Sequence, residues 1–209
     1  MYIVFYGPEG SGKGTQANLL SQKVGITLLG SGDLVRKYAK EDHGIMGRIC
    51  KESLQRGHYV ADSEMYVLWK QRFKEQDTRQ GWVLDGFPRN LTQAKFLARK
   101  VEKYGQAINA VFFLDVSRAE SLRRLLKRGR KSPDGSNHDS PERIRERLEH
   151  YTKGKEAVLR YYKKRGVLVH INGERPVDKI HKEITKTIKG IQEKMKSSEK
   201  GDIERSKQK

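Results

Sequence analysis

The sequence predicts an α/β fold in which a parallel sheet is covered by helices on both faces, which makes three layers. Two observations support this prediction. Short apolar runs of strand length alternate with segments of helical periodicity, an alternation that is typical of parallel sheets. A glycine-rich loop also follows the first of these runs directly. The expected strands are residues 2–6, 27–29, 81–85, 110–115 and 167–171.

Two helices can be placed from local signals. From Lys13 onward apolar residues recur at helical spacing, and Gly25 ends that segment. Ser140 and Pro141 form a favourable helix start, with serine at the N-cap and proline in the first turn. Both helices are therefore expected to contribute an apolar face to the core.

Two stretches interrupt the alternation of strands and helices. Residues 31–60 are polar and expected to be helical, whereas residues 129–139 have the composition of a loop. Insertions of this kind in α/β proteins lie over the carboxyl ends of the strands, where ligands bind. We therefore expect one domain over residues 1–193, with its core in 1–30, 61–128 and 140–193. The charged segment 194–209 is expected to be disordered or a frayed helix.

The composition restricts the class of protein. Cys50 is the only cysteine among 209 residues, which excludes an internal disulfide and a multi-cysteine structural zinc site. No apolar run is long enough for a membrane span, and the first residues do not have the pattern of a signal peptide. We therefore expect a cytoplasmic protein without a membrane partner. The net charge of +18 favours polyanionic ligands, either nucleic acid or several phosphate groups in one pocket.

The glycine-rich loop has the features of a phosphate-binding loop of the P-loop NTPase type. It fits G-x-x-x-x-G-K-[ST] when one glycine is allowed between the lysine and the threonine, and it follows a strand and opens a helix. Its backbone N–H groups can converge on phosphate oxygens. Lys13 would reach the outer phosphates, and the Thr15 hydroxyl would lie near a magnesium ion. The residues expected to contact the phosphates are Gly10, Ser11, Gly12, Lys13, Gly14 and Thr15.

A second group of polar residues follows the predicted strand 81–85. Asp85 at the end of this strand could hold magnesium through water. Arg89 could bind another phosphate through two hydrogen bonds. Gln93, one helical turn later, would lie near Arg89, although it could instead form a capping box with Asn90.

With these motifs the chain resembles the adenylate kinases, a family of nucleoside monophosphate kinases, in their short-lid form. The resemblance rests on four blocks that span about the first 175 residues: "GPEGSGKGTQ", "GSGDLVR", "GWVLDGFPRNLTQA" and "RLLKRGR" to "IRERL". It implies a five-stranded parallel core, a helical monophosphate-binding segment at 31–60 and a short lid at 129–139. It also implies magnesium-dependent transfer of a phosphoryl group from ATP to AMP, giving two ADP.

The resemblance further implies roles for individual residues. The positions for AMP are Ser31, Arg36, Gly57, Tyr59, Val60, Gly86, Arg89 and Gln93. Besides the phosphate-binding loop, the positions for ATP are Arg124, Gly173 and Arg175. The transferring phosphoryl group would be bound by Lys13, Arg89, Arg124, Arg128, Arg130 and Arg147. Several arginines suit this reaction, because phosphoryl transfer depends mostly on positioning and on stabilising spread negative charge.

The chain departs from the family pattern at a few positions. Glu9 stands where proline is usual, and Tyr59 where leucine or methionine is usual. His138 and Asp139 stand where short lids often have two aspartates, and Ser136 where they have arginine. Either another arginine supplies the lid's cation or that cation is absent; of the two candidates beside the loop, Arg128 and Arg130, we expect Arg130 to fold inward.

Two other functions remain open at this level. Pyrimidine monophosphate kinases share nearly all of these motifs, although Gln93 and Ser31 favour adenine. A nucleic-acid-binding protein would also suit the charge of +18, but the sequence contains no RNA-binding motif or zinc finger. The expected partners are therefore ATP, AMP and ADP, without a specific nucleic acid, and the expected oligomeric state is a monomer.

Overall fold

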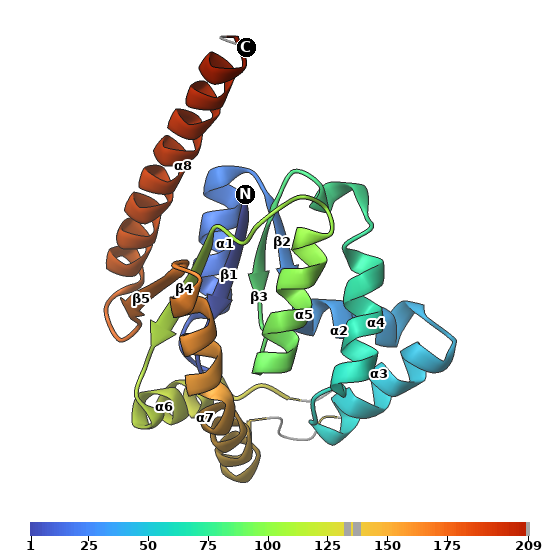
Figure 1. Cartoon of the computed structure of the whole chain (residues 1–209). Helices are drawn as coiled ribbons and strands as arrows, with labels where there is room; N and C mark the ends of the chain where they lie inside the picture. Colours follow the sequence, from blue (N-terminus) through green and yellow to red (C-terminus); the bar gives the residue numbers. More distant parts are fainter. Residues whose placement is uncertain (132–134, 136–138, 208–209) are drawn as a thin grey trace.

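A computed structural model of the chain describes residues 1–131, 135 and 139–207. Within this part the strands form one five-stranded parallel sheet in the order β2-β3-β1-β4-β5 (Figure 1). The strands are β1 (Tyr2–Tyr6), β2 (Thr27–Gly30), β3 (Trp82–Asp85), β4 (Ala110–Asp115) and β5 (Leu168–Asn172). Their number and their places in the sequence confirm the predicted strands to within one residue at each end.

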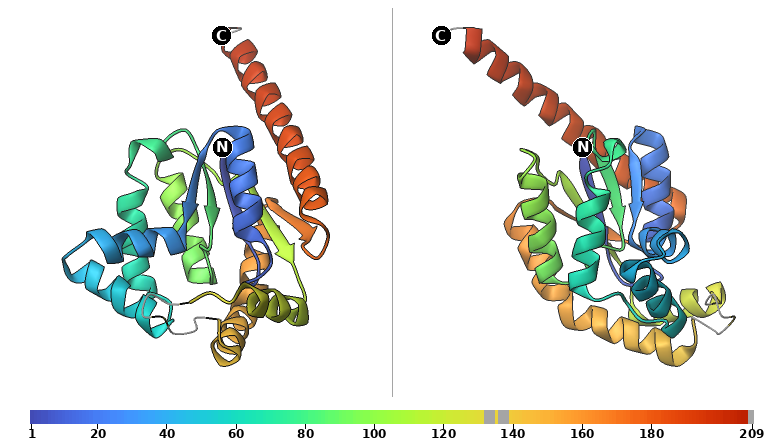
Figure 2. Two further views of the ribbon diagram at one scale, coloured as in Figure 1. Left: turned by 180° about the vertical axis from the view of Figure 1, so that it is seen from behind. Right: turned by 90° about the vertical axis from the view of Figure 1, so that its right-hand side faces the viewer.

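Helices cover both faces of the sheet, as the alternating pattern predicted (Figure 2). The expected helix starts at Lys13 and Pro141 are confirmed, and the predicted helical segment 31–60 contains α2 and α3. The helices in the first half of the chain are α1 (Lys13–Val24), α2 (Ser31–Glu41), α3 (Ile45–Arg56), α4 (Asp62–Arg72) and the short 3₁₀ helix η1 (Gln76–Thr78). Those in the second half are α5 (Leu91–Glu102), α6 (Arg118–Arg128), α7 (Pro141–Lys164) and α8 (Val177–Lys207).

The core has two halves because successive side chains of a strand point to opposite faces of the sheet. Tyr2, Val4 and Tyr6 of β1 face a cluster that contains buried residues of α4, α5 and α7. Ile3 and Phe5 face a second cluster, to which α1 and α8 contribute. All five residues of β1 are buried, as is usual for the central strand of a parallel sheet.

The position of the site follows from the strand order. β1 lies between β3 and β4, and the next strand in the sequence, β2, lies beyond β3 at one edge of the sheet. The chain therefore changes sides at β1, and ligands bind at such switch points in open parallel sheets. The loop after β1 needs glycine at this point. A Cβ atom on Gly7 would lie 2.6 Å from the Leu114 carbonyl oxygen, and one on Gly10 would lie 2.9 Å from that of Ser121.

The prediction for residues 194–209 was disorder or a frayed helix, and the structure has a helix there: α8 continues to Lys207 and projects beyond the rest of the fold (Figure 1). The physical reason is propagation. Ile180, Ile184 and Ile188 anchor the first turns in the core, and each further residue adds a helical bond without a new nucleation step. Among the residues that follow, lysine, which favours helices, is the most frequent, glutamate recurs, and there is no proline.

The described residues contain no candidate for a membrane-spanning helix. None of their helices combines the length and the apolar character that a bilayer crossing requires.

Candidate active site

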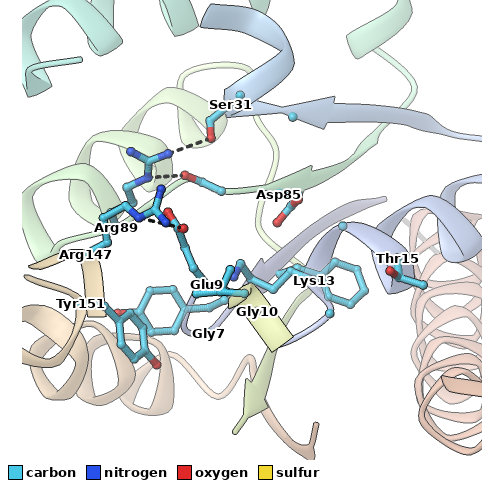
Figure 3. A pocket seen from close by; sticks show the side chains of 18 of the residues that line it. Gly7, Glu9, Gly10, Lys13, Thr15, Ser31, Asp85, Arg89, Arg147 and Tyr151 are labelled. Carbon is cyan, nitrogen blue, oxygen red and sulfur yellow. Dashed lines mark hydrogen bonds and ion pairs between the residues drawn. The ribbon is translucent and has the colours of Figure 1, made fainter. Parts of the chain in front are cut away.

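A cavity of about 640 Å³ opens at the carboxyl ends of β1 and β3. It is lined by the loop after β1, by the start of α2, by the loop after β3 and by arginines of α6 and α7. Of the residues singled out from the sequence, those lining it are Gly10, Gly12, Lys13, Gly14, Thr15, Ser31, Arg36, Tyr59, Asp85, Gly86, Arg89, Arg124, Arg128, Arg130 and Arg147. Most of the predicted site residues are therefore brought together around one space (Figure 3).

Lys13 lies at the first turn of α1, directly behind the glycine-rich loop. Its Nζ atom donates to the Pro8 carbonyl oxygen at 2.7 Å and lies 3.4 Å from Ser11 Oγ. Burial lowers the pKa of this lysine, while the nearby carboxylates of Asp85 and Glu9 act in the opposite direction. An anion that entered the loop would favour the charged amine and offer it a better partner than a neutral carbonyl.

Asp85 ends β3 beside the phosphate-binding loop. Its Oδ1 atom is buried without a hydrogen-bond partner in the described part of the chain, and a Cβ atom on Gly14 would lie 3.2 Å from Oδ2. Burial raises the pKa of the Asp85 carboxyl, and Lys13 and Arg89 oppose this. A buried carboxylate oxygen without a partner, with the Thr15 side chain lining the same cavity, is a donor set that suits Mg²⁺ and its bound waters.

Arg89 is held at three points on the wall of the cavity. Its Nε atom donates to the Gly86 carbonyl oxygen at 3.0 Å, and Nη2 donates to Ser31 Oγ at 3.4 Å (Figure 3). Its guanidinium carbon lies 3.6 Å from the centre of the Tyr59 ring, a cation–π geometry. The side chain is therefore ordered before any anion arrives.

Gln93 lies beside Arg89, as predicted, but behind the cavity wall. Its Oε1 atom accepts from the Arg89 backbone N–H at 2.7 Å, and its Nε2 donates to Asp62 Oδ1 at 2.6 Å. Asn90 caps α5 by accepting from the Gln93 N–H, whereas the Gln93 side chain does not return to Asn90 as a capping box would require. In this state the amide links α5 to α4, and the side chain is 3% exposed.

Arg128 and Arg147 share one buried carboxylate. Arg128 donates from Nε and Nη2 to the two oxygens of Asp139, both at 2.9 Å, and Arg147 Nη2 donates to Oδ1 at 2.9 Å. Burial raises the pKa of Asp139, but these hydrogen bonds outweigh it and lower the pKa to about 2. The two arginines are therefore already oriented toward the cavity by an anion that belongs to the protein.

Arg124 and Arg130 complete the group of cations. Arg124 Nη1 donates to the Gly173 carbonyl oxygen at 3.0 Å, and its Nε donates to Glu120 at 2.6 Å. The Arg130 backbone N–H donates to Asp139 at 3.1 Å. Burial and the neighbouring charges of Arg128 and Arg36 lower the pKa of the Arg130 side chain, as expected among like charges. The serine at 136, where the family pattern has arginine, lies outside the described residues.

Six predicted residues do not line the cavity. Ser11 lies under the loop, where its hydroxyl faces Lys13, and Gly57 ends α3 beside Arg143. The carbonyl of Gly173 is bound by Arg124, and the Arg175 side chain pairs with Glu183 rather than pointing into the cavity. Val60 and Gln93 are buried in the wall.

The cavity wall also contains residues for which the sequence predicted no role, among them Glu9, His150 and Tyr151. The Glu9 carboxylate accepts from the Tyr59 hydroxyl and lies 3.3 Å from Arg147 Nε. His150 and Tyr151 of α7 line the cavity as well. Glu9 could have been selected from the sequence, because a charged residue inside a phosphate-binding loop is unusual. The sequence around His150 and Tyr151 contains no motif that would have selected them.

Comparison with known proteins agrees with this geometry. Residues 5–167 match the family model described as adenylate kinase. The chain is 36% identical to adenylate kinase 1 of Nostoc sp. over 186 residues, which covers 89% of this chain and 97% of that protein. It is 35% identical to an adenylate kinase of Stenotrophomonas maltophilia over 190 residues, with 91% of this chain and 100% of that protein covered. The chain belongs to the adenylate kinase family of phosphotransferases.

Proposed function

We propose that the protein transfers the γ-phosphoryl group of ATP to AMP in a reversible, magnesium-dependent reaction that gives two ADP. The observation that carries this proposal is one cavity in which a phosphate-binding loop meets arginines from five separate helices or loops. In the reaction an oxygen of the AMP phosphate attacks the γ-phosphorus, and the bond from that phosphorus to the β,γ-bridging oxygen breaks. The attacking phosphate is already ionised at neutral pH, so the protein needs cations rather than a general base.

The ATP phosphates would lie in the loop between β1 and α1. Backbone N–H groups of residues 10–15 would surround the β-phosphate, supported by the positive end of α1. Lys13 would leave the Pro8 carbonyl and bind the outer phosphates, because a charge-assisted hydrogen bond is about twice as strong as a neutral one. The backbone from Gly173 to Val177 would pass beside the adenine, close to Arg124.

Magnesium would be held by Thr15 and Asp85, directly or through water. Members of the family generally use magnesium-bound ATP. When bound, the ion would neutralise phosphate charge and orient the phosphates for in-line attack. Magnesium is commonly bound by one or two protein oxygens together with waters and substrate phosphates, which fits these two residues.

The AMP phosphate would bind Arg36 and Arg89. Arg36 lines the cavity from α2 and now pairs with the exposed Asp33 at 2.7 Å, a weak partner that a phosphate can replace. Ser31, Gly57, Val60 and Gly86 would surround the nucleoside, whereas the Tyr59 ring is occupied by the Arg89 guanidinium. Gln93 would read the adenine edge after exchanging its bond to Asp62.

Arg124, Arg128, Arg130 and Arg147 would stabilise the transition state. Their present partners are carboxylates and carbonyls of the protein, so binding of phosphates is an exchange of one set of acceptors for another. Such preorganised cations need little rearrangement when charge spreads over the transferring group. This is the main source of rate enhancement that the site offers.

The function is tested by an ADP-release assay of the purified full-length chain with ATP and AMP, UMP, CMP or GMP in parallel. We expect magnesium-dependent ADP formation with AMP, and little with the other acceptors. Equal use of UMP or CMP would assign the chain to the pyrimidine monophosphate kinases. Absence of phosphoryl transfer to all four acceptors would overturn the proposal.

Two further expectations concern partners. We propose that the monomer is the active unit, because a single chain supplies both the phosphate-binding loop and the arginines that the reaction needs. Sedimentation at assay concentration measures this directly. The net charge of +18 is expected to give only salt-sensitive, sequence-independent attraction to nucleic acid, which a titration of RNA binding against salt concentration would reveal.

A further inference from the structure

Glu9 and Tyr59 belong to different segments of the cavity wall, and the structure brings these two residues into direct contact. They are 50 residues apart, yet the Tyr59 hydroxyl donates to Glu9 Oε1 at 2.5 Å. Glu9 lies in the loop that would bind the ATP phosphates, whereas Tyr59 ends the segment that would bind AMP. The hydrogen bond therefore joins the two nucleotide-binding parts of the cavity.

Tyr59 also contacts Arg89 through its ring. The Arg89 guanidinium carbon lies 3.6 Å from the ring centre, close enough for a strong cation–π contact. A hydroxyl bound at its far end keeps the ring from rotating away, so the Glu9 contact and the Arg89 contact support one another. Burial and the neighbouring Glu9 carboxylate raise the pKa of the Tyr59 hydroxyl, which keeps it a hydrogen-bond donor.

Arg89 is left with one free donor group. Its Nε and Nη2 are used by Gly86 and Ser31, while Nη1 has no hydrogen-bond partner in the part of the chain that the structure describes. The flat face of the guanidinium rests on Tyr59, so the direction in which Nη1 points depends on that ring. A leucine at this position would leave the arginine with hydrogen bonds along one edge only.

Glu9 has a second partner that fixes its own position. Its Oε2 atom lies 3.3 Å from Arg147 Nε, and Figure 3 shows the carboxylate directed from the loop toward Arg147. The carboxylate is therefore held at the wall of the cavity by Tyr59 on one oxygen and by Arg147 on the other. Burial raises the pKa of Glu9, but Arg147 and the Tyr59 hydrogen bond outweigh it, so Glu9 stays ionised.

We propose that the Glu9–Tyr59 pair is a positioning device for Arg89, which sets the affinity of the site for the acceptor phosphate. The inference rests on the proposed function, since it treats Arg89 as a ligand of AMP. Tyr59 acts through Arg89 and Glu9 acts through Tyr59. Loss of either residue therefore weakens binding of AMP more than binding of ATP.

The first experiment compares Tyr59→Leu and Tyr59→Phe. Tyr59→Leu removes the ring and the hydroxyl, and we expect it to raise KM for AMP about tenfold. Tyr59→Phe keeps the ring and loses the bond to Glu9, and we expect a rise of about threefold. KM for ATP should change less than twofold in both variants. Calorimetric titration of AMP without ATP should show the same order of affinities, independently of catalysis.

A matched control is available in α7. Tyr161 lies under Arg165, with the guanidinium carbon 4.3 Å from the ring centre, and neither residue lines the cavity. Tyr161→Phe and Tyr161→Leu therefore make the same chemical changes away from the nucleotides. Both should leave the two KM values unchanged, even where Tyr161→Leu lowers the melting temperature.

The second experiment is a double-mutant cycle with Glu9→Ala and Tyr59→Phe. Because both changes break one hydrogen bond, we expect the double variant to raise KM for AMP no more than the larger single effect. A direct effect of the Glu9 charge on either nucleotide would appear equally with and without the Tyr59→Phe change, so it cancels in the coupling energy between the two residues. Additive effects would mean that the two residues act independently.

The outcomes separate the inference from the proposed function. An active native enzyme whose Tyr59→Leu variant keeps its KM for AMP, or raises both KM values equally, would overturn the role given to the pair. A native protein that makes no ADP would overturn the proposed function instead, while calorimetry with AMP would still test the pair.

Discussion

Asp139 and Arg147 form a buried ion pair at the centre of the cation cluster, with Arg147 Nη2 donating to Asp139 Oδ1 at 2.9 Å. Their side chains are 0% and 6% exposed, and Arg128 binds the same carboxylate. The pair joins the start of α7, where Ser140 is the N-cap, to a residue that lines the cavity. One acidic side chain therefore supports both the fold of this region and the orientation of two arginines.

The stability of the protein should fall in acid because of Asp139. Its pKa is about 2 in the folded protein, below the ordinary 3.8, so the unfolded chain binds its proton first as the pH falls. The stabilisation is complete above about pH 4 and is lost toward pH 2; it amounts to about 2 kcal/mol. Urea unfolding of the native protein and of Asp139→Asn should differ by about this amount at pH 7 and converge near pH 2.

A surface carboxylate provides the control for that measurement. Asp178 is exposed in the first turn of α8, far along the chain from the cluster. Asp178→Asn should leave the loss of unfolding free energy between pH 7 and pH 2 nearly the same as in the native protein. An Asp139→Asn protein with the native pH dependence would contradict the assignment.

Lys13→Met should lower kcat by about a hundredfold to a thousandfold, because it removes a preorganised cation from the phosphates. The lysine binds the loop and not the apolar core, so the melting temperature should change little. Lys23→Met is the matched control, since Lys23 is exposed in the last turn of the same helix α1. Steady-state kinetics and thermal unfolding test both variants. An active Lys13→Met enzyme would disprove the role given to the loop.

Arg130→Ala should lower kcat more than it raises KM for AMP. The side chain lines the cavity, and we expect its contact with the transferring phosphoryl group to form mainly in the transition state. A decrease in kcat of about a hundredfold is expected for the loss of one such cation. The neighbouring Lys131 is exposed, and Lys131→Ala should be close to native. If Arg130→Ala is silent, whereas deletions within residues 132–138 abolish activity, the lid cation lies in that segment instead.

Gln93→Ala should weaken selection of the base. If Gln93 binds adenine, its loss should raise KM for AMP by the equivalent of about 1–3 kcal/mol, while the low activity with UMP and CMP changes less. The same substitution also removes the acceptor of the Arg89 N–H, so KM for all acceptors is expected to rise somewhat. The informative quantity is therefore the ratio of kcat/KM for AMP to that for UMP. A native ratio near one, or a ratio unaffected by Gln93→Ala, would exclude base reading by this residue.

Removal of metal should separate catalysis from stability. Among the described residues there is no cluster of three or more His, Cys, Asp or Glu side chains that could hold a structural ion. Excess chelator should therefore stop ADP formation and leave the melting temperature nearly unchanged. Added magnesium should restore the rate. A large fall in melting temperature would reveal a structural metal.

Local sequence features determined most of the framework. The five apolar runs became the five strands because a strand buried on both faces of a parallel sheet needs continuous apolar residues. Ser140 began α7 because its side chain can accept from the N–H of Arg143, a contact within one turn. The phosphate-binding loop and Asp85 were predictable for a similar reason, since each directly follows a strand whose end lies at the switch point of the sheet.

Long-range packing decided what the local patterns left open. Gln93 could have capped α5, but Asp62 from α4 and the Arg89 N–H lie within its reach and fix its amide otherwise. In the sequence, nothing connects Glu9 with Tyr59. They form a hydrogen bond only because the segment 31–60 packs close to the loop after β1. Such contacts depend on how helices dock on the sheet, and no periodicity or cap within a single segment carries that information.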